Sequence, residues 1–217
     1  MSKLTWMLLV YRVPTEPASR RVTVWRELKR LGSLYLQQCV CILPDRPDLR
    51  TDVERIVEKI DAFEGQCTLF EIPHLRPADE EHIVESFRSL RNKEYREIVE
   101  ECETKFVKEI EFEHFRQNYT FEEAEEIGQD LEKIRRWFDR IVARDWFDAS
   151  GRKDVEGWIE RCADLLSEFE HEVYKRSPDD VPGDGSELLR SPIVPRLVAR
   201  DDSAERSVGP QREETGS

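Results

Sequence analysis

Two groups of basic side chains have the types and spacing to do chemistry, and that chemistry is phosphate binding. The first group lies in and just before a helix expected at residues 19–31 and comprises Arg12, Arg20, Arg21, Arg26, Lys29 and Arg30. The apolar arc of that helix comprises Val24, Trp25, Leu28 and Leu31. Arg26, Lys29 and Arg30 fall on the opposite arc, where each phosphate contact would add salt-dependent affinity. An ordinary solvated face, with Lys29 and Arg30 complementing the helix C-terminus, is the alternative.

Arg21 differs from its neighbours because its position falls inside the apolar arc, near the helix start. A guanidinium in apolar surroundings needs an anion or a carboxylate beside it. We therefore expect Arg21, before the other cations, to contact a phosphate.

The second group lies on a later helix and comprises Lys133, Arg136, Arg140 and Arg144. These residues project within one arc, opposite the apolar seam formed by Ile127, Leu131, Ile134 and Phe138. They form a second candidate phosphate-binding surface. The alternative is a stabilising charge gradient, because acidic residues fill the first turn of this helix and basic residues fill its last.

Other reactive side chains form no recognisable site. Cys39 and Cys41 are expected on one side of a strand as buried small residues, since no second close Cys pair and no His at ligand spacing accompanies them. The four histidines share no motif, and no GxSxG, Walker or Rossmann glycine pattern appears. The sequence therefore predicts no enzyme activity, no metal site and no cofactor.

The elements that carry the first group predict an α+β domain over residues 1–76. An apolar stretch, Leu4–Val13, predicts a strand covered on both faces. Ser19 is expected to cap the helix that follows, and Gly32 to end it before a hairpin or bent strand. A capping box at Thr51–Glu54 then opens a second helix, and Gln66–Ile72 predicts a last strand. This order is typical of a ferredoxin-like antiparallel sheet with helices on one face.

Residues 77–176 predict an antiparallel bundle of about three helices. The first runs to about residue 115, with a possible kink at Arg91–Glu94, and Thr120 caps the second. The third carries apolar residues from Val155 to Val173. Residues 177–217 contain five prolines and four glycines without periodicity, which is typical of a disordered tail.

Composition narrows the class of protein. The chain of 217 residues has a net charge of -13, yet residues 1–50 hold nine Lys/Arg against four Asp/Glu, so the remainder carries -18. This asymmetry indicates a local basic footprint on an acidic protein. No apolar run is long enough to span a membrane, and Met1–Val13 is too short for a secretory signal. Together with five cysteines, these features predict a cytoplasmic protein in a reducing compartment.

Several spaced segments together resemble one known family. They are Trp6–Pro14, Arg20-Arg21, Val24–Arg26, Leu28–Gly32, Tyr35–Gln38, Leu43–Asp45, Glu94-Tyr95, Thr120–Glu123, Asp130-Leu131 and Arg144–Phe147. In these segments the chain resembles the N-terminal region of ChrB proteins, regulators of bacterial chromate-resistance operons, over roughly residues 4–176.

The resemblance implies transcription regulation with operator DNA as the partner. Together with the uneven charge, it predicts that the chain contacts DNA mainly through the DNA backbone and forms a homodimer. Full ChrB proteins also carry a second domain, to which chromate sensing is ascribed. Because the periodic pattern ends near Tyr174, that domain is expected to be absent, which speaks against chromate binding. A protein-interaction module that binds no nucleic acid is the alternative function.

The opening unit is more distantly similar to the middle domain of PaaX-type repressors, which shares its fold with the small CRISPR adaptation nuclease subunit. Such nucleases place an Asp at the end of the first strand to hold a divalent metal. Here the corresponding residues are Tyr11-Arg12-Val13, and a cation repels Mg²⁺. A metal-dependent nuclease is therefore the least favoured function.

Overall fold

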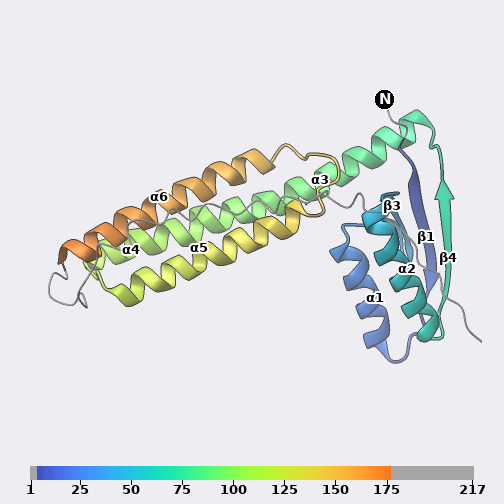
Figure 1. Cartoon of the computed structure of the whole chain (residues 1–217), viewed down its shortest axis with the longest axis horizontal. Coiled ribbons are helices and arrows are strands. Elements are labelled where there is room, and N and C mark those ends of the chain that lie inside the picture. Colours follow the sequence, from blue (N-terminus) through green and yellow to red (C-terminus); the bar gives the residue numbers. More distant parts are fainter. Residues whose placement is uncertain (1–3, 177–217) are drawn as a thin grey trace, which may run out of the picture. The chain divides into compact units, whose positions relative to one another are not determined.

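A four-stranded antiparallel sheet with two helices forms the N-terminal part of the computed structural model, which describes residues 4–176 (Figure 1). Its elements are β1 (Trp6–Arg12), α1 (Ala18–Arg30), β2 (Leu34–Gln37), β3 (Val40–Pro44), α2 (Pro47–Ala62) and β4 (Gln66–Ile72). The strand order is β2-β3-β1-β4, and every neighbouring pair is antiparallel. This arrangement confirms the predicted ferredoxin-like fold. The tail predicted at residues 177–217 lies outside the described residues.

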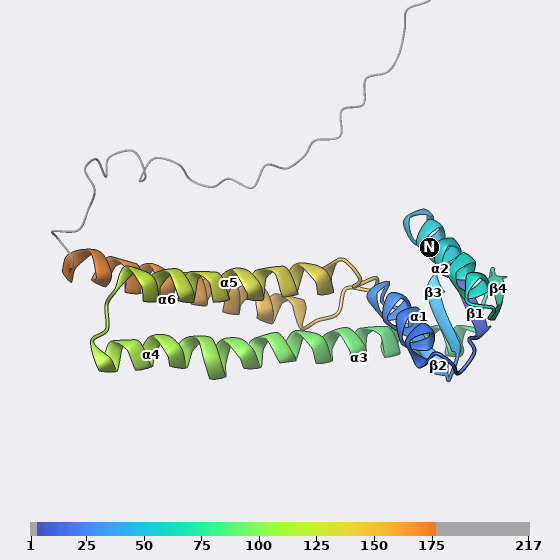
Figure 2. The same cartoon turned by 90° about the horizontal axis from the view of Figure 1, so that it is seen from below.

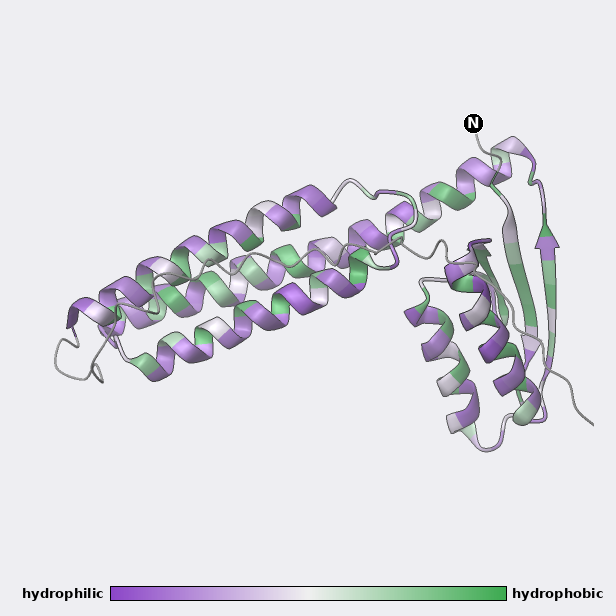
Figure 3. Ribbon diagram, viewed as in Figure 1, coloured by the Kyte–Doolittle hydropathy of each residue, from purple (hydrophilic) through white to green (hydrophobic). Residues whose placement is uncertain are grey.

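One face of the sheet packs against α1 and α2. Alternate residues of a strand point to opposite faces, so Met7, Leu9 and Tyr11 share a face of β1. They form a buried cluster with Val24 and Leu28 of α1 and with side chains of α2. Figure 3 shows β1 and β4 with long hydrophobic stretches, whereas α1 and α2 carry hydrophobic and hydrophilic residues on alternating sides. The cluster thereby determines which side of α1 faces solvent.

The opposite face of the sheet is covered only at one end. There the Trp6 ring centroid lies 6.1 Å from that of Phe87 and 5.8 Å from that of Phe147. Val10, farther along β1 on this face, is 40% exposed. The prediction of a strand covered on both faces is thus wrong near Val10. Within residues 4–176, the first turns of α3 (Pro77–Glu101) and the segment around Phe147 cover this side of the sheet, and they do so near Trp6.

Two predicted helix starts are wrong. α1 begins at Ala18, and Pro17 rather than Ser19 occupies its N-cap position. α2 begins at Pro47, so Thr51 lies inside the helix and does not cap it. A proline at the first helical position has a suitable φ and lacks an N–H that would have no partner there, which accounts for the earlier start of α2.

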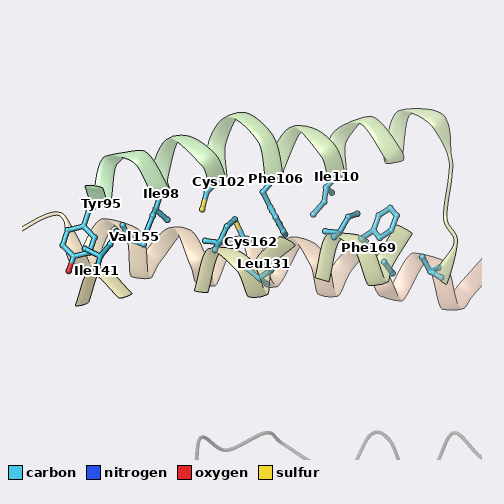
Figure 4. Close-up of a cluster of buried hydrophobic side chains, with 14 of the residues drawn as sticks. Tyr95, Ile98, Cys102, Phe106, Ile110, Leu131, Ile141, Val155, Cys162 and Phe169 are labelled. Carbon is cyan, nitrogen blue, oxygen red and sulfur yellow. The ribbon is translucent and has the colours of Figure 1, made fainter. Parts of the chain in front are cut away.

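Residues 77–176 form long helices that pack around a second buried core (Figures 2 and 4). They are α3, a π-helical turn η1 (Cys102–Phe106), α4 (Val107–Arg116), α5 (Phe121–Val142) and α6 (Arg152–Arg176). The Thr120 hydroxyl accepts a hydrogen bond from the Glu123 backbone N–H at 3.2 Å, which confirms the predicted cap. None of the helices between residues 4 and 176 has both the length and the apolar content to cross a membrane.

The predicted kink at Arg91–Glu94 is wrong, because α3 continues through these residues without interruption. Arg91 is only 4% exposed, and its Nη1 lies 3.2 Å from Oε2 of Glu94. Glu94 also pairs with Arg144, whose Nη2 lies 3.0 Å from Oε1. Burial lowers the pKa of Arg91, and Glu94 opposes this. Arg91 and Glu94 of the polar run therefore form a largely buried ion cluster with Arg144. The irregular turn of the helix comes later, at η1.

Gly32 follows α1, as predicted, and lies against the segment that follows α5. Its φ of +77° belongs to the left-handed region that favours glycine. A Cβ at this position would lie 2.9 Å from Cβ of Arg144 and 3.1 Å from Nε1 of Trp146. The C-terminal end of α1 is thus held close to the turn that follows α5.

Candidate nucleic-acid interface

Among the helices of residues 4–176, α1 has the largest excess of basic over acidic side chains. It carries the cations Arg20, Arg21, Arg26, Lys29 and Arg30 and a single acid, Glu27. Glu27 pairs with Lys59 of α2, so it does not neutralise the outer cations of its own helix. Arg21, Arg26 and Arg30 are exposed, and Lys29 is half-buried.

Most of these cations have no acidic partner. Arg12, Arg21, Arg26, Lys29 and Arg30 form no ion pair with any carboxylate of residues 4–176. Lys29 instead places Nζ over the Tyr35 ring, 5.6 Å from its centroid. Five cations that are free to meet external phosphates therefore lie on or just before one short helix.

Arg20 differs, because it is engaged by the end of α2. Its Nη1 donates a hydrogen bond to the Phe63 carbonyl at 3.2 Å and lies 3.9 Å from Oε2 of Glu64. The guanidinium also lies 5.6 Å from the centroid of the Phe63 ring. We conclude that Arg20 mainly joins α1 to α2, which leaves it less available to a ligand.

Arg21 does not lie in apolar surroundings, contrary to the prediction. Arg21 is exposed to solvent and is not enclosed in the apolar side of α1. The buried side of the helix is narrower than the predicted arc and centres on Val24 and Leu28. Arg21 therefore needs no buried counter-charge, although it remains free to contact a phosphate.

Trp25 is less covered than the sequence predicts. Its position falls in the apolar arc of α1, but the side chain is 48% exposed. It lines a hollow of about 440 Å³ between α1 and β2, together with Arg21, Tyr11 and Tyr35. Its position at the edge of the arc, beside the edge strand of the sheet, was the signal that this side chain would be incompletely covered.

Two hydrogen-bonded tyrosines border the hollow. The hydroxyls of Tyr11 and Tyr35 lie 2.9 Å apart. Burial raises the pKa of Tyr11 to about 12, and burial together with the bond to Tyr11 raises the pKa of Tyr35 still further. Both side chains are therefore neutral at physiological pH, and the charge of Arg21, which lines the hollow, is not offset by a phenolate.

The second predicted surface is mixed in charge. Arg136 and Arg140 are exposed without ion pairs inside residues 4–176, but Lys133 pairs with Asp130 at 2.6 Å. A hollow of about 320 Å³ beside Lys133 and Arg140 is also lined by Glu101, Glu109 and Asp130. Burial and the nearby Asp130 raise the pKa of Glu109, as expected of acidic surroundings.

Arg144 does not extend this surface, contrary to the prediction. α5 ends at Val142, so the helical spacing that placed Arg144 on the same arc no longer applies. Its side chain is 19% exposed and pairs with Glu94 of the buried ion cluster. Arg144 thus joins α3 to the turn after α5.

The predicted pair of thiols on one strand face is also wrong. Cys39 lies in the turn between β2 and β3, with a φ of +62°, whereas Cys41 is buried within β3. Burial raises the pKa of Cys41 to about 12, so it stays a thiol. Across residues 4–176 no group of three or more His, Cys, Asp or Glu side chains is arranged to hold a metal ion.

Comparisons with known proteins agree with the resemblance noted above. A family model described as "Protein ChrB, N-terminal" matches residues 21–179. Protein ChrB of Cupriavidus metallidurans is 25% identical over 155 residues, which cover 70% of this chain and 44% of that protein. The match thus spans less than half the length of this curated relative, and no solved structure matches the chain with significance. Because the family model covers well over half of the residues, the chain belongs to the ChrB N-terminal family.

Proposed function

We propose that this chain is a cytoplasmic transcription regulator linked to chromate resistance, and that it binds DNA through the cations of α1. The link to chromate resistance rests on the membership of the ChrB family. The contact with DNA rests on one structural observation: Arg21, Arg26, Lys29 and Arg30 extend from one helix without acidic partners in residues 4–176.

Electrostatic attraction would drive this contact. A protein that neutralises phosphates releases condensed counterions, so its affinity falls steeply as salt rises. A net charge of -13 opposes DNA binding in general, so productive contacts must be confined to a locally basic surface. α1 provides that surface, and contacts of this kind fix position on the duplex without reading its sequence.

A triple charge reversal tests the proposal. The variant Arg26→Glu, Lys29→Glu, Arg30→Glu should abolish salt-sensitive binding to the DNA upstream of its own gene. Fluorescence anisotropy at low and at physiological salt measures this. The matched control is Lys93→Glu, Arg96→Glu, Lys108→Glu, three exposed cations of α3 and α4 without ion pairs in residues 4–176. Equal losses in both variants, or no binding by the wild-type chain, would count against the proposal.

A homodimer belongs to the proposal, and the open half of the sheet is its proposed interface. Val10, Leu36 and Phe70 point to the same side of the sheet and are 40%, 44% and 47% exposed. Exposed apolar patches of this kind mark association surfaces. Phe70→Glu should convert a dimer to a monomer in sedimentation velocity, whereas Phe115→Glu, on the distant α4, should not.

A protein-interaction module is the second candidate, and exposed aromatic rings on the bundle favour it, two of which, Phe121 and Tyr174, contact each other. Phe112, Phe115, Phe121 and Tyr174 are 54%, 87%, 41% and 59% exposed. On this alternative, Phe115→Ser with Tyr174→Ser would abolish regulation of a reporter operon, and charge reversal on α1 would leave it intact. The proposal for DNA predicts the opposite pattern.

The proposal involves no catalytic step. Incubation of the chain with DNA and Mg²⁺ or Mn²⁺ tests whether the chain cleaves the DNA.

A further inference from the structure

The exposed indole of Trp25 is the least expected feature of α1. Tryptophan side chains are among the most buried on average, and exposing one costs favourable burial. Trp25 is 48% exposed, whereas Trp6 is completely buried. A large planar ring kept in solvent on a helix that carries four free cations calls for a ligand with its own planar face.

Two cations flank this ring along the helix. Arg21 precedes Trp25 by four residues and Lys29 follows it by four, so all three lie on one flank of α1. A helix rises about 6 Å over four residues, so the cations lie about one helical turn to either side of the ring. Lys29 is also held over the Tyr35 ring, which directs its charge toward β2.

The hollow beside Trp25 completes the arrangement. It has a volume of about 440 Å³ and is also lined by Tyr11, Tyr35, Gln37 and Gln38. Gln37 and Gln38 are exposed at the end of β2, and each side-chain amide offers both a donor and an acceptor. The hollow therefore combines an aromatic wall, amide groups and the guanidinium of Arg21, and Lys29 lies next to it over the Tyr35 ring.

We propose that this hollow takes an unstacked nucleobase of DNA, an inference that rests on the proposed function. The base stacks on the Trp25 indole, its flanking phosphates meet Arg21 and Lys29, and the amides of Gln37 and Gln38 contact the base edge. Aromatic stacking of this type serves unpaired bases, because a paired base in a duplex has no free face. Charge complementarity selects a nucleic acid over a neutral aromatic molecule as occupant, since Arg21 and Lys29 have no acidic partner in residues 4–176.

The test compares three DNA probes of the same sequence: a duplex, that duplex with a central unpaired bubble, and a single strand. Fluorescence anisotropy gives the affinity of the full chain for each. The wild-type chain should bind the bubble and the single strand more tightly than the duplex. Trp25→Ala should weaken binding to the two unpaired probes by about 5- to 100-fold and should leave the duplex affinity nearly unchanged. Trp25→Phe, which keeps a stacking face, should restore most of the preference.

The control is Phe115→Ala, which removes another exposed aromatic ring, on α4, and should change none of the three affinities. A wild-type chain without preference for unpaired bases, or a preference that survives Trp25→Ala, would overturn this inference. The proposed function would still hold after either of these outcomes if the chain binds the duplex in a salt-sensitive way and loses that binding when the charges of α1 are reversed. If no probe binds at any salt concentration, both ideas fail together.

Discussion

α1 and α5 both carry a series of basic residues, yet the structure gives the two helices different roles. α1 has five cations and one acid, and that acid, Glu27, forms an ion pair with Lys59 of α2. α5 has four cations and seven acids, and two of its cations, Lys133 and Arg135, pair with acids of the same helix. α1 buries only Val24 and Leu28, whereas α5 buries five residues in the bundle core. A series of cations thus indicates a binding surface only where neighbouring acids do not already neutralise it.

The largest effect should come from the apolar side of α5. Leu131 is 3% exposed within the core of the bundle (Figure 4). Leu131→Ala leaves a cavity and should lower the free energy of unfolding by about 2–5 kcal/mol. Urea denaturation measures this, with Arg26→Ala on α1 as a control that should stay within about 0.5 kcal/mol of wild type. Similar losses in both variants would remove the distinction between a structural and a binding helix.

A matched pair of charge reversals compares the two helices directly. Arg26 and Arg30 on α1, and Arg136 and Arg140 on α5, are both spaced by four residues, exposed and without ion pairs in residues 4–176. Arg26→Glu with Arg30→Glu should weaken DNA binding by roughly 10- to 100-fold and reduce the slope of affinity against salt. Arg136→Glu with Arg140→Glu should change it less than about twofold if α5 makes no phosphate contact. Equal losses would show that α5 belongs to the interface.

Gly32 lies where the end of α1 meets the segment after α5, and its substitution should affect both stability and DNA binding. In Gly32→Ala the new Cβ would meet Arg144 at 2.9 Å, at a φ of +77° that other residues rarely adopt. We expect a loss of about 1–3 kcal/mol in the free energy of unfolding, together with weaker DNA binding as the end of α1 shifts. Thermal unfolding and anisotropy measure the two effects. Gly157→Ala in α6, where the Cβ would meet nothing within 4 Å, is the control and should not destabilise the chain.

The Tyr11–Tyr35 pair makes the region beside α1 sensitive to alkaline pH. The pKa of Tyr11 is raised from 10.0 to about 12 in the folded chain, so the unfolded chain releases this proton first. The resulting stabilisation is complete below pH 10.0 and is lost as the pH rises through about 12. Tyr11→Phe leaves the Tyr35 hydroxyl without this partner, which should cost about 1 kcal/mol at neutral pH, and the alkaline decline should become shallower.

Urea denaturation at neutral pH and between pH 10 and pH 12 checks this expectation. Tyr174→Phe, which changes a 59% exposed tyrosine on α6, serves as the control and should leave the pH profile unaltered. A decline as steep in Tyr11→Phe as in wild type would show that other groups dominate, such as Cys41, whose burial also raises its pKa to about 12.

Much of the fold was predictable because it depends on periodicity. The last strand, Gln66–Ile72, has the bounds that the sequence predicts, and the apolar seam of α5 is buried as expected. Helix starts were less predictable, since Ser19 and Thr51 are plausible caps but Pro17 and Pro47 set the beginnings of α1 and α2. Local sequence preferences cannot show which of two nearby starts the sheet will favour.

The candidate site was harder to predict because it depends on what covers each residue. Trp25 and Arg21 fall within an ideal apolar arc, but α1 lies at the edge of the sheet, and its buried side is narrower than the arc. Arg144 fits the spacing of Lys133 and Arg140, but the helix ends before it. Both errors come from applying helical periodicity without knowing where the neighbouring elements end.

The smallest effect should come from the ion pair that distinguishes α5 from α1. Lys133 lies 2.6 Å from Asp130, with 64% of the Lys133 side chain and 47% of the Asp130 side chain exposed. An exposed pair three residues apart on a helix contributes only about 0.2–0.5 kcal/mol, because solvent screens it. A double-mutant cycle with Lys133→Ala and Asp130→Ala, followed by urea denaturation, should give a coupling in that range that disappears at high salt. A coupling above about 1 kcal/mol would mean that the pair is structural. Weaker DNA binding by Lys133→Ala alone would mean that Asp130 does not neutralise it, and the charge distinction between α1 and α5 would no longer hold.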